Sequence, residues 1–405
     1  MWQVRNTDRG EPRDVPCRPI NSGHYFTATG IQNNIFRSKP KEMVIELAVL
    51  SGFQPKILAL ISMTSLSVLS ISNTIAAPPI DPARASITLK RSTCYGPCPA
   101  YEVKIHGDGR VQFSTETASM AEVDPARRKF ASSEGVLLPG THEDWITPEA
   151  VKDLIGKFQA AGFWHLKNEY IIGIVDLPTY SLTIDTGQQR KTVVEQAGSR
   201  WVRMPPVVTD LQNATDQVAG TDRWVIGSPA LISWLERVRF DFRSPHAAEL
   251  AAAGEWGKAS EAMVGALIDR GAPLDQPVSP GGITMLETEA AGMSLIKAAI
   301  KRGHAGVFNR LMALGWLDRL GKLKAAEYFA QSAAGCSPAL VDAVADAGVD
   351  IDLSAPPPPN DYLPDSRGRT ALARLQTSHA CQDDEARRAQ TVARLIARGA
   401  KPKPS

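Results

Sequence analysis

Residues 93–113 read TCYGPCPAYEVKIHGDGRVQF and join two closely spaced cysteines to an alternating run and a glycine turn. From Tyr101 to Ile105, apolar and polar side chains alternate, which is typical of a strand with one face on a core and the other in water. The turn Gly107-Asp108-Gly109 separates this run from a second one. An Asp-Gly pair in that position predicts a β-hairpin in which both turn residues need positive φ.

The flanking sequence supplies the other elements of a small domain over residues 86–227. A strand-like run at 87–91 precedes the stretch, and a second hairpin is expected around Gly187-Gln188. One helix is predicted between Thr147, which can cap it, and Gly162, which can end it; another is predicted over 205–219. The fold class is therefore α+β, a small antiparallel sheet with helices on one face.

A polar segment at residues 116–145 interrupts this pattern and is expected to form a long exposed loop. Its His142, Glu143 and Asp144 adjoin each other. Such a trio is a weak candidate for a metal site, and a solvated surface is the simpler interpretation.

Cysteine usage is typical of an exported protein. Cys17 lies in the N-terminal leader, and the rest of the chain keeps an even number, which allows three pairings in an oxidising compartment. We favour Cys94–Cys98 with Cys336–Cys381, because each pair then lies within one domain.

The CYGPC segment admits three interpretations. A redox centre is disfavoured, because three residues separate the cysteines and a strand follows, not the helix that would stabilise a thiolate. A metal site needs three or four ligands, and His106 is the nearest histidine. A local disulfide fits best, and the stiff loop that it closes, with Tyr95, Gly96 and Pro97 at its tip, is also a candidate binding epitope.

The N-terminus does not resemble a folded domain. Residues 1–42 are polar and aperiodic, and we interpret them as an over-extended gene start or a disordered leader. Residues 43–76 are predicted to be a signal peptide, with an apolar run at 57–71 and small residues before Ala77. An uncleaved anchor and a buried helix are the alternatives. The expected location is the periplasm or the medium, with membrane contact only through an uncleaved signal.

From residue 228 to residue 405 the sequence is typical of helices and is weakly repetitive. Four segments end in a glycine followed by a short turn, at Gly271, Gly315, Gly348 and Gly399. Trp316 follows one of these glycines and is either an exposed binding anchor or a side chain packed under the next loop. Stacked helix pairs would bury an apolar set: Leu267, Ile268, Leu311, Met312, Val341, Val344, Leu395 and Ile396.

The chain resembles two protein families. Residues 245–403 are similar to degenerate ankyrin repeats: the stretch from Asp365 to Leu372, DSRGRTAL, is close to the D-x-x-G-x-T-P-L opening, with Ala371 in the proline position. An unrelated helical bundle or solenoid is the alternative. Residues 86–226 resemble a bacterial domain family of unknown function with a C-Y-G-x-C-P-x-Y motif and a later F-W-x-L, here at Phe163, Trp164 and Leu166. This resemblance implies no chemistry.

Composition and motifs limit the classes of function that the chain can have. The net charge is +2, so nothing favours nucleic acid or anionic lipid as the main partner. Dinucleotide, P-loop, zinc-protease and serine-hydrolase motifs are missing from the sequence, and we expect no cofactor, metal or catalytic residue. Asp176 and Asp185 are conceivable paired carboxylates, but such residues more often cap turns.

The sequence therefore predicts an exported binding protein that recognises another protein through its repeat array. The alternative is an envelope enzyme, a thiol oxidoreductase or a hydrolase, that uses the CYGPC domain and is targeted by the repeats. An inhibitor of another protein is a third reading. The oligomeric state is left open.

Overall fold

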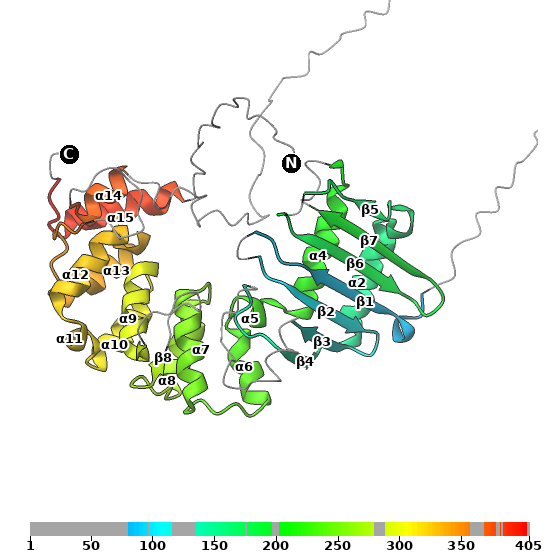
Figure 1. Ribbon diagram of the computed structural model, residues 1–405, viewed down its shortest axis with the longest axis horizontal. Coiled ribbons are helices and arrows are strands. Elements are labelled where there is room, and N and C mark those ends of the chain that lie inside the picture. Colours follow the sequence, from blue (N-terminus) through cyan, green and yellow to red (C-terminus); the bar gives the residue numbers. More distant parts are fainter. Residues whose placement is uncertain are drawn as a thin grey trace, which may run out of the picture. The chain divides into compact units, whose positions relative to one another are not determined.

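The computed structural model describes most of the chain after residue 79 (Figure 1). The described ranges are 80–95, 98–115, 135–174, 176–196, 202–278, 288–356, 368–377, 381 and 384–402. The predicted leader and signal peptide lie outside these residues, as do Gly96 and Pro97. Within the described part, no helix is both long and apolar enough to cross a bilayer.

A seven-stranded sheet forms the first half of the described chain, in the order β4-β3-β2-β1-β6-β7-β5 (Figure 1). Neighbouring strands are antiparallel except β5 and β7, which are parallel, so the expected antiparallel sheet is in fact mixed. The two-residue β5 has no alternation that the sequence could show. The strands are β1 (Ser86–Arg91), β2 (Tyr101–His106), β3 (Arg110–Ser114), β4 (Thr141–Trp145), β5 (Glu169–Tyr170), β6 (Thr179–Asp185) and β7 (Arg190–Gln196).

The β2–β3 hairpin is present with Val103 opposite Phe113. Its turn differs from the prediction, because Gly109 has a positive φ (94°) and Asp108 does not. The N–H of Gly109 donates to the carbonyl of His106 at 2.9 Å, which makes a three-residue loop with a left-handed glycine at its end. Gly107 is needed for another reason: a Cβ there would lie 1.9 Å from the carbonyl oxygen of Pro82 in η1 (Pro82–Arg84).

Helices α2 (Pro148–Ala160) and α4 (Pro206–Ala219) cover one face of the sheet and contact each other (Figure 1). The hydroxyl oxygen of Thr147 accepts from the N–H of Ala150 at 3.2 Å, as expected of a cap. Gly162 ends α2 with a left-handed φ of 59° and leads into η3 (Phe163–His165). The predicted helices and their face are thus confirmed.

The end of the polar segment is not an exposed loop. Residues 141–145 form the edge strand β4, paired with β3. Asp144 is buried and forms ion pairs with Arg223 at 2.5 Å and Arg237 at 2.7 Å. The indole N–H of Trp234 donates to the carbonyl of Glu143 at 2.9 Å. The prediction failed because the partners of these polar groups come from about 80–90 residues further along the chain.

The second half consists of helix pairs stacked in two rows. The first helices of the pairs, α7, α9, α12 and α14, contact each other in succession, and so do the second helices, α8, α10, α13 and α15. The predicted repeat glycines have positive φ: 94° at Gly271, 79° at Gly315, 69° at Gly348 and 96° at Gly399. The helices are α5 (Asp222–Val225), α6 (Ala230–Arg237), α7 (Pro245–Trp256), α8 (Glu261–Asp269), α9 (Ala291–Arg302), α10 (Ala305–Ala313), α11 (Trp316–Leu320), α12 (Lys322–Gln331), η4 (Ala333–Cys336), α13 (Pro338–Asp346), α14 (Ala371–Thr377) and α15 (Glu385–Ala397).

Short antiparallel pairings precede two of the first helices. Strand β8 (Pro277–Val278) pairs with β9 (Glu289–Ala290) before α9, and Ala355 pairs with Arg369 before α14. Two connections between helix pairs thus contain an extended pairing, whereas helix α11 lies in the connection between α10 and α12.

The predicted core of the stack is mostly correct. Met312 and Ile396 are the exceptions, with 36% and 50% of their surface exposed. Each follows a buried leucine in a second helix, and successive helical residues lie about 100° apart. The other predicted core residues are buried: Leu267, Ile268, Leu311, Val341, Val344 and Leu395.

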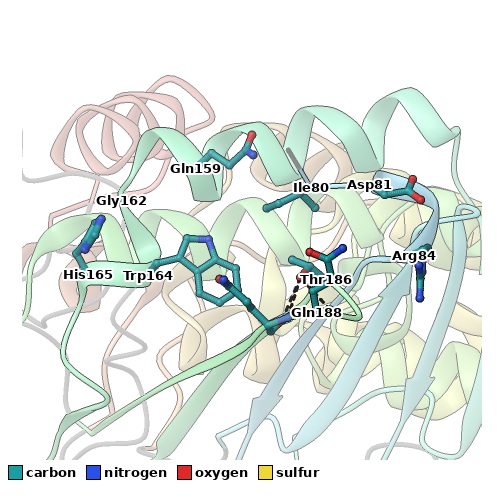
Figure 2. Close-up of a pocket in the computed structure, with 10 residues that line it drawn as sticks. Ile80, Asp81, Arg84, Gln159, Gly162, Trp164, His165, Thr186 and Gln188 are labelled. Carbon is teal, nitrogen blue, oxygen red and sulfur yellow. Dashed lines mark hydrogen bonds between the residues drawn. The ribbon is translucent and has the colours of Figure 1, made fainter. Parts of the chain in front are cut away.

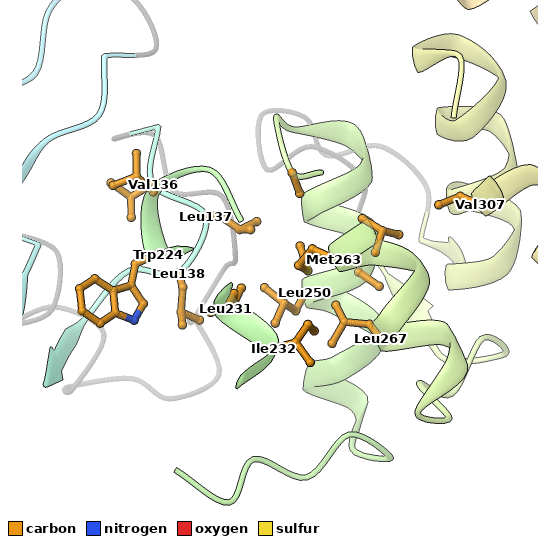
Figure 3. Packing of buried hydrophobic residues seen from close by; sticks show 14 of the residues in the cluster. Val136, Leu137, Leu138, Trp224, Leu231, Ile232, Leu250, Met263, Leu267 and Val307 are labelled. Atoms are coloured by element: carbon orange, nitrogen blue, oxygen red, sulfur yellow. The ribbon is translucent and has the colours of Figure 1, made fainter. Parts of the chain in front are cut away.

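The sheet and the stack share one core (Figure 3). The N–H groups of Leu137 and Leu138 donate to carbonyls of α5, each at 2.9 Å, and Leu231 of α6 continues the cluster. At Gly227 an added Cβ would lie 2.5 Å from Leu137 and 2.9 Å from Met263 of α8. Glycine at 227 allows these segments to approach closely.

Candidate functional site

The disulfide loop links the end of β1 to the start of β2. Cys94 and Cys98 are bonded, with 5.6 Å between their Cα atoms, as predicted. Tyr95 is 89% exposed, while its N–H donates to the carbonyl of Asp176 at 3.1 Å. The loop therefore has a fixed base and presents an aromatic ring to solvent; Gly96 and Pro97 of the predicted epitope lie outside the described residues.

A buried charged cluster anchors the strand ends below this loop. Arg91 of β1 donates to Oδ2 of Asp216 on α4 through Nε at 3.2 Å and Nη2 at 2.6 Å. The hydroxyl of Tyr101, the last residue of the CYGPCPAY motif, donates to Oδ1 of Asp216 at 2.7 Å, and that of Thr221 donates to the same oxygen at 2.9 Å. The carboxylate thus accepts four hydrogen bonds.

The electrostatics of the cluster favour an anchor over a catalytic base. Burial alone would lower the pKa of Arg91, but the neighbouring Tyr101 and Asp216 outweigh it, so the pKa is raised. Burial raises the pKa of Tyr101, and the charge of Asp216 raises it further. Arg91 therefore stays charged and Tyr101 stays a donor.

Sequence reasoning missed Arg91 and Asp216. They are 125 positions apart, and nothing local marks either one. Tyr101 was identified only as part of the motif. Asp216 is one of several polar residues on the predicted 205–219 helix, and Gln212 and Thr215 are also buried, so the helix sequence does not single it out.

Asp185 and Asp176, the possible paired carboxylates named from the sequence, contact two separate loops. Oδ1 of Asp185 accepts from the N–H of Gly187 at 2.8 Å, so Asp185 caps the β6–β7 turn. Asp176 is exposed, and its backbone holds the disulfide loop. The turn-capping interpretation is confirmed for Asp185.

The second disulfide joins two neighbouring helix pairs. Cys336 lies in η4, between α12 and α13, and Cys381 lies between α14 and α15. Their Cα atoms are 6.0 Å apart. The predicted pairing is present, and it fastens the last pair of the stack to the one before it.

Trp316 is a packing residue in this structure. Its side chain is 3% exposed, and a Cβ on Gly292 would lie 2.1 Å from its ring. The guanidinium of Arg319 lies 4.2 Å from the ring centroid. The ring fills the space above Gly292 of α9 and is not an exposed anchor.

A face of the first-helix row carries aromatic rings next to lysines; we call it the first-helix face (Trp256, Met293, Lys297, Lys301 and Tyr328). Lys301 of α9 lies 5.3 Å from the ring of Trp256 on α7, and Lys297 of α9 lies 6.0 Å from the ring of Tyr328 on α12. The indole of Trp256 also donates to the hydroxyl of Ser294 at 2.7 Å. The four-residue spacing of the three α9 side chains was visible in the sequence, but their neighbours on α7 and α12 were not.

Ion pairs occur on both rows: Lys297 of the first-helix face pairs with Glu289 of β9 at 2.5 Å, and in the second-helix row charges pair across neighbouring helices. Arg310 of α10 binds Asp269 of α8 at 2.9 Å. Arg394 of α15 and Arg398, the residue that follows this helix, bind Asp342 of α13 at 2.6 and 2.7 Å. Charged groups in this row are thus used within the stack.

Fold and site together define an α+β domain, with a stapled loop over a buried charged cluster, continued by a two-row helix stack. Residues 85–219, about a third of the chain, match the family described as "Domain of unknown function (DUF6438)". This match supports the resemblance to a domain family of unknown function noted over residues 86–226. No curated protein matches the chain.

Proposed function

We propose that the chain is an exported binding protein that recognises another protein through the first-helix face. We interpret the stack as a degenerate ankyrin-like array. Three features support that reading: paired helices in two rows, left-handed glycines after the second helices, and antiparallel pairings before α9 and α14.

The first-helix face carries the proposal. Trp256 and Tyr328 are half-buried, so their rings are held by the stack and lose little entropy on binding. Aromatic anchors of this kind dominate protein interfaces. Lys301 is exposed beside Trp256, so a partner that offers carboxylates is favoured.

Export is supported by the two disulfides. Cysteine pairs of this kind persist in oxidising compartments and are rare in the cytosol. Alkylation of the protein without reductant, taken directly from an envelope fraction, should label none of Cys94, Cys98, Cys336 and Cys381. Labelling of these four cysteines in freshly isolated protein would contradict export.

The enzyme alternative has less support. Cys94 and Cys98 are joined to each other, and the carboxylate of Asp216 is occupied by four donors. A disulfide is also the oxidised state of a thiol oxidoreductase, but strand β2 and not a helix follows Cys98, so no helix N-terminus stabilises a thiolate there.

Site-specific photo-crosslinking tests the binding proposal. A photoreactive phenylalanine analogue replaces Tyr328 on the first-helix face or, as a matched control, Asn309 on the exposed side of α10. In cells that make the full chain, the Tyr328 position should give a discrete protein adduct and the Asn309 position should not. Equal adducts from both positions, or no adduct from the Tyr328 position, would refute recognition through this face.

A partner identified in this way allows a second test. Trp256→Ala should weaken its binding at least about tenfold, as expected for an aromatic anchor. Lys301→Glu should slow association mainly at low salt, because a charge at the rim acts on encounter.

A further inference from the structure

A hollow of about 380 Å³ lies at the opposite end of β1 from the disulfide loop. It lies between η1, the end of α2, η3 and the β6–β7 turn (Figure 2). Trp164 and Ile80 lie at its middle, Gln159 is above them, and Thr186 and Gln188 are below (Figure 2). Neither the proposed binding face nor the charged cluster uses these residues.

The sequence Gly162-Phe163-Trp164 explains why an indole lines this hollow. Gly162 adopts a left-handed φ and turns the chain at the end of α2. Phe163 is then fully buried, with its ring 4.9 Å from that of Phe158. The next side chain, Trp164, packs on the core only in part and has a face left for the hollow. The F-W pair of the resembled family thus has one residue in the core and one at the hollow.

The opposite wall is held by its own hydrogen bonds. The hydroxyl oxygen of Thr186 accepts from the N–H of Gln189 at 3.1 Å, and Asp185 accepts from Gly187 at 2.8 Å. The side chains of Gln188 and Gln189 therefore project from a fixed turn. Sites on a fixed backbone bind with a smaller loss of entropy.

The polar groups of the lining suit hydroxyl groups. Glutamine amides donate and accept at once, as hydroxyls do. Asp81 and Arg84 add one acceptor and one donor group of opposite charge, so the lining favours a neutral ligand. A wholly apolar ligand would desolvate the amides without replacing their hydrogen bonds, which is unfavourable.

We propose that this hollow binds a neutral saccharide, with a sugar ring stacked on Trp164 and its hydroxyls bonded by Gln159 and Gln188. A pyranose has an apolar C–H face for the indole and hydroxyls around its edge. Ligand sites commonly have volumes of about 300–1,000 Å³, so this hollow takes a mono- or disaccharide. The proposal is independent of the partner protein proposed above.

Titration of the full chain tests this. The probes are glucose, galactose, N-acetylglucosamine and their β-1,4-linked disaccharides, observed by saturation-transfer NMR and calorimetry. At least one should bind saturably with a Kd of about 1 mM or tighter. Trp164→Ala should weaken it at least about tenfold, and Trp164→Phe less.

Two further variants keep the result interpretable. Trp145→Ala removes an indole that is 63% exposed on β4, away from the hollow, and should leave the Kd unchanged. Gln159→Ala with Gln188→Ala removes exposed side chains whose loss leaves the fold intact, and should weaken binding several-fold.

The two probe sizes separate the sources of the ligand. Tighter binding of a disaccharide assigns the site to a glycan chain, and equal affinity assigns it to a single sugar; both support the proposal. The absence of saturable binding at about ten times the expected Kd would overturn it. Undiminished binding by Trp164→Ala or by the glutamine double variant would also overturn it.

Discussion

Asp216→Asn tests whether the charged cluster below the disulfide loop holds the sheet together. The substitution keeps the shape of the side chain and an oxygen that can accept from Tyr101 and Thr221. It removes the charge opposite Arg91, whose side chain is 12% exposed, while that of Asp216 is 20% exposed. Arg91 would then be a nearly buried cation without its carboxylate.

The magnitude follows from that burial. Breaking a buried ion pair by removing one partner costs about 3–5 kcal/mol, and the residual exposure favours the lower end, about 3 kcal/mol. Arg91→Met should cost about the same, because it leaves the carboxylate with two neutral donors. The double variant should cost about 3 kcal/mol and not the sum of about 6, since no unpaired charge remains.

Hydrogen exchange of the β1 and β2 amides is the appropriate assay. It reports the free energy of opening at the amides of these two strands, residue by residue. Asp210→Asn is the matched control, an exposed carboxylate on the same helix, and should change the opening free energy by less than about 0.5 kcal/mol. A coupling energy between Arg91 and Asp216 within about 0.5 kcal/mol of zero would refute the anchoring role.

Three other outcomes are expected. Cys336→Ser with Cys381→Ser should lower the free energy of unfolding by about 4 kcal/mol, and Cys94→Ser with Cys98→Ser should lower it by about 2 kcal/mol. The difference is expected because a longer closed loop restricts the unfolded chain more. Urea titrations measure both values, and equal losses would contradict this account. Burial lowers the pKa of His142 in the folded protein, so on acidification the unfolded chain takes up this proton at a higher pH than the folded chain does. Stability should therefore fall as the pH drops below about 6.5. His142→Gln should flatten the profile of melting temperature against pH, and an unchanged slope would count against the mechanism. Gly303→Ala should destabilise by more than about 2 kcal/mol, because φ is 78° and its Cβ would lie 2.3 Å from the carbonyl oxygen of Gly335; Gly156→Ala in mid-α2, with nothing within 4 Å, should instead stabilise by about 0.5–1 kcal/mol in the same urea titrations.

Local patterns in the sequence predicted the local elements. Alternation predicted the β2–β3 and β6–β7 hairpins, and Thr147 and Gly162 marked the ends of α2. Both disulfide pairings followed from assigning the cysteines to domains. In each case the residues that decide the element are neighbours in sequence or belong to one region. Alternation of apolar residues, a helix-capping residue, or the number of cysteines in a domain was therefore sufficient for the prediction.

The missed features depend on distant partners. β4 looked like loop because its residues are polar, and only the structure shows that α5 and α6 supply Arg223, Arg237 and Trp234 to them. The Arg91–Asp216 pair and the contacts of Trp256 with α9 are likewise contacts between separate elements. A single sequence contains no signal for which of many charged or aromatic residues will meet.

The contacts around α6 explain why the sheet and the stack form one compact unit within residues 75–405. Trp234 closes the outer edge of the sheet at β4, while other apolar residues of the same helix pack with the leucines before β4 and with α8. A large apolar side chain contributes about 1.5–3 kcal/mol when buried, and α6 buries Leu231, Ile232, Trp234 and Leu235. These side chains have partners on both sides, so neither region closes its core at this end without α6. The helix that begins the repetitive half of the sequence is therefore also the cover of the sheet's edge strand.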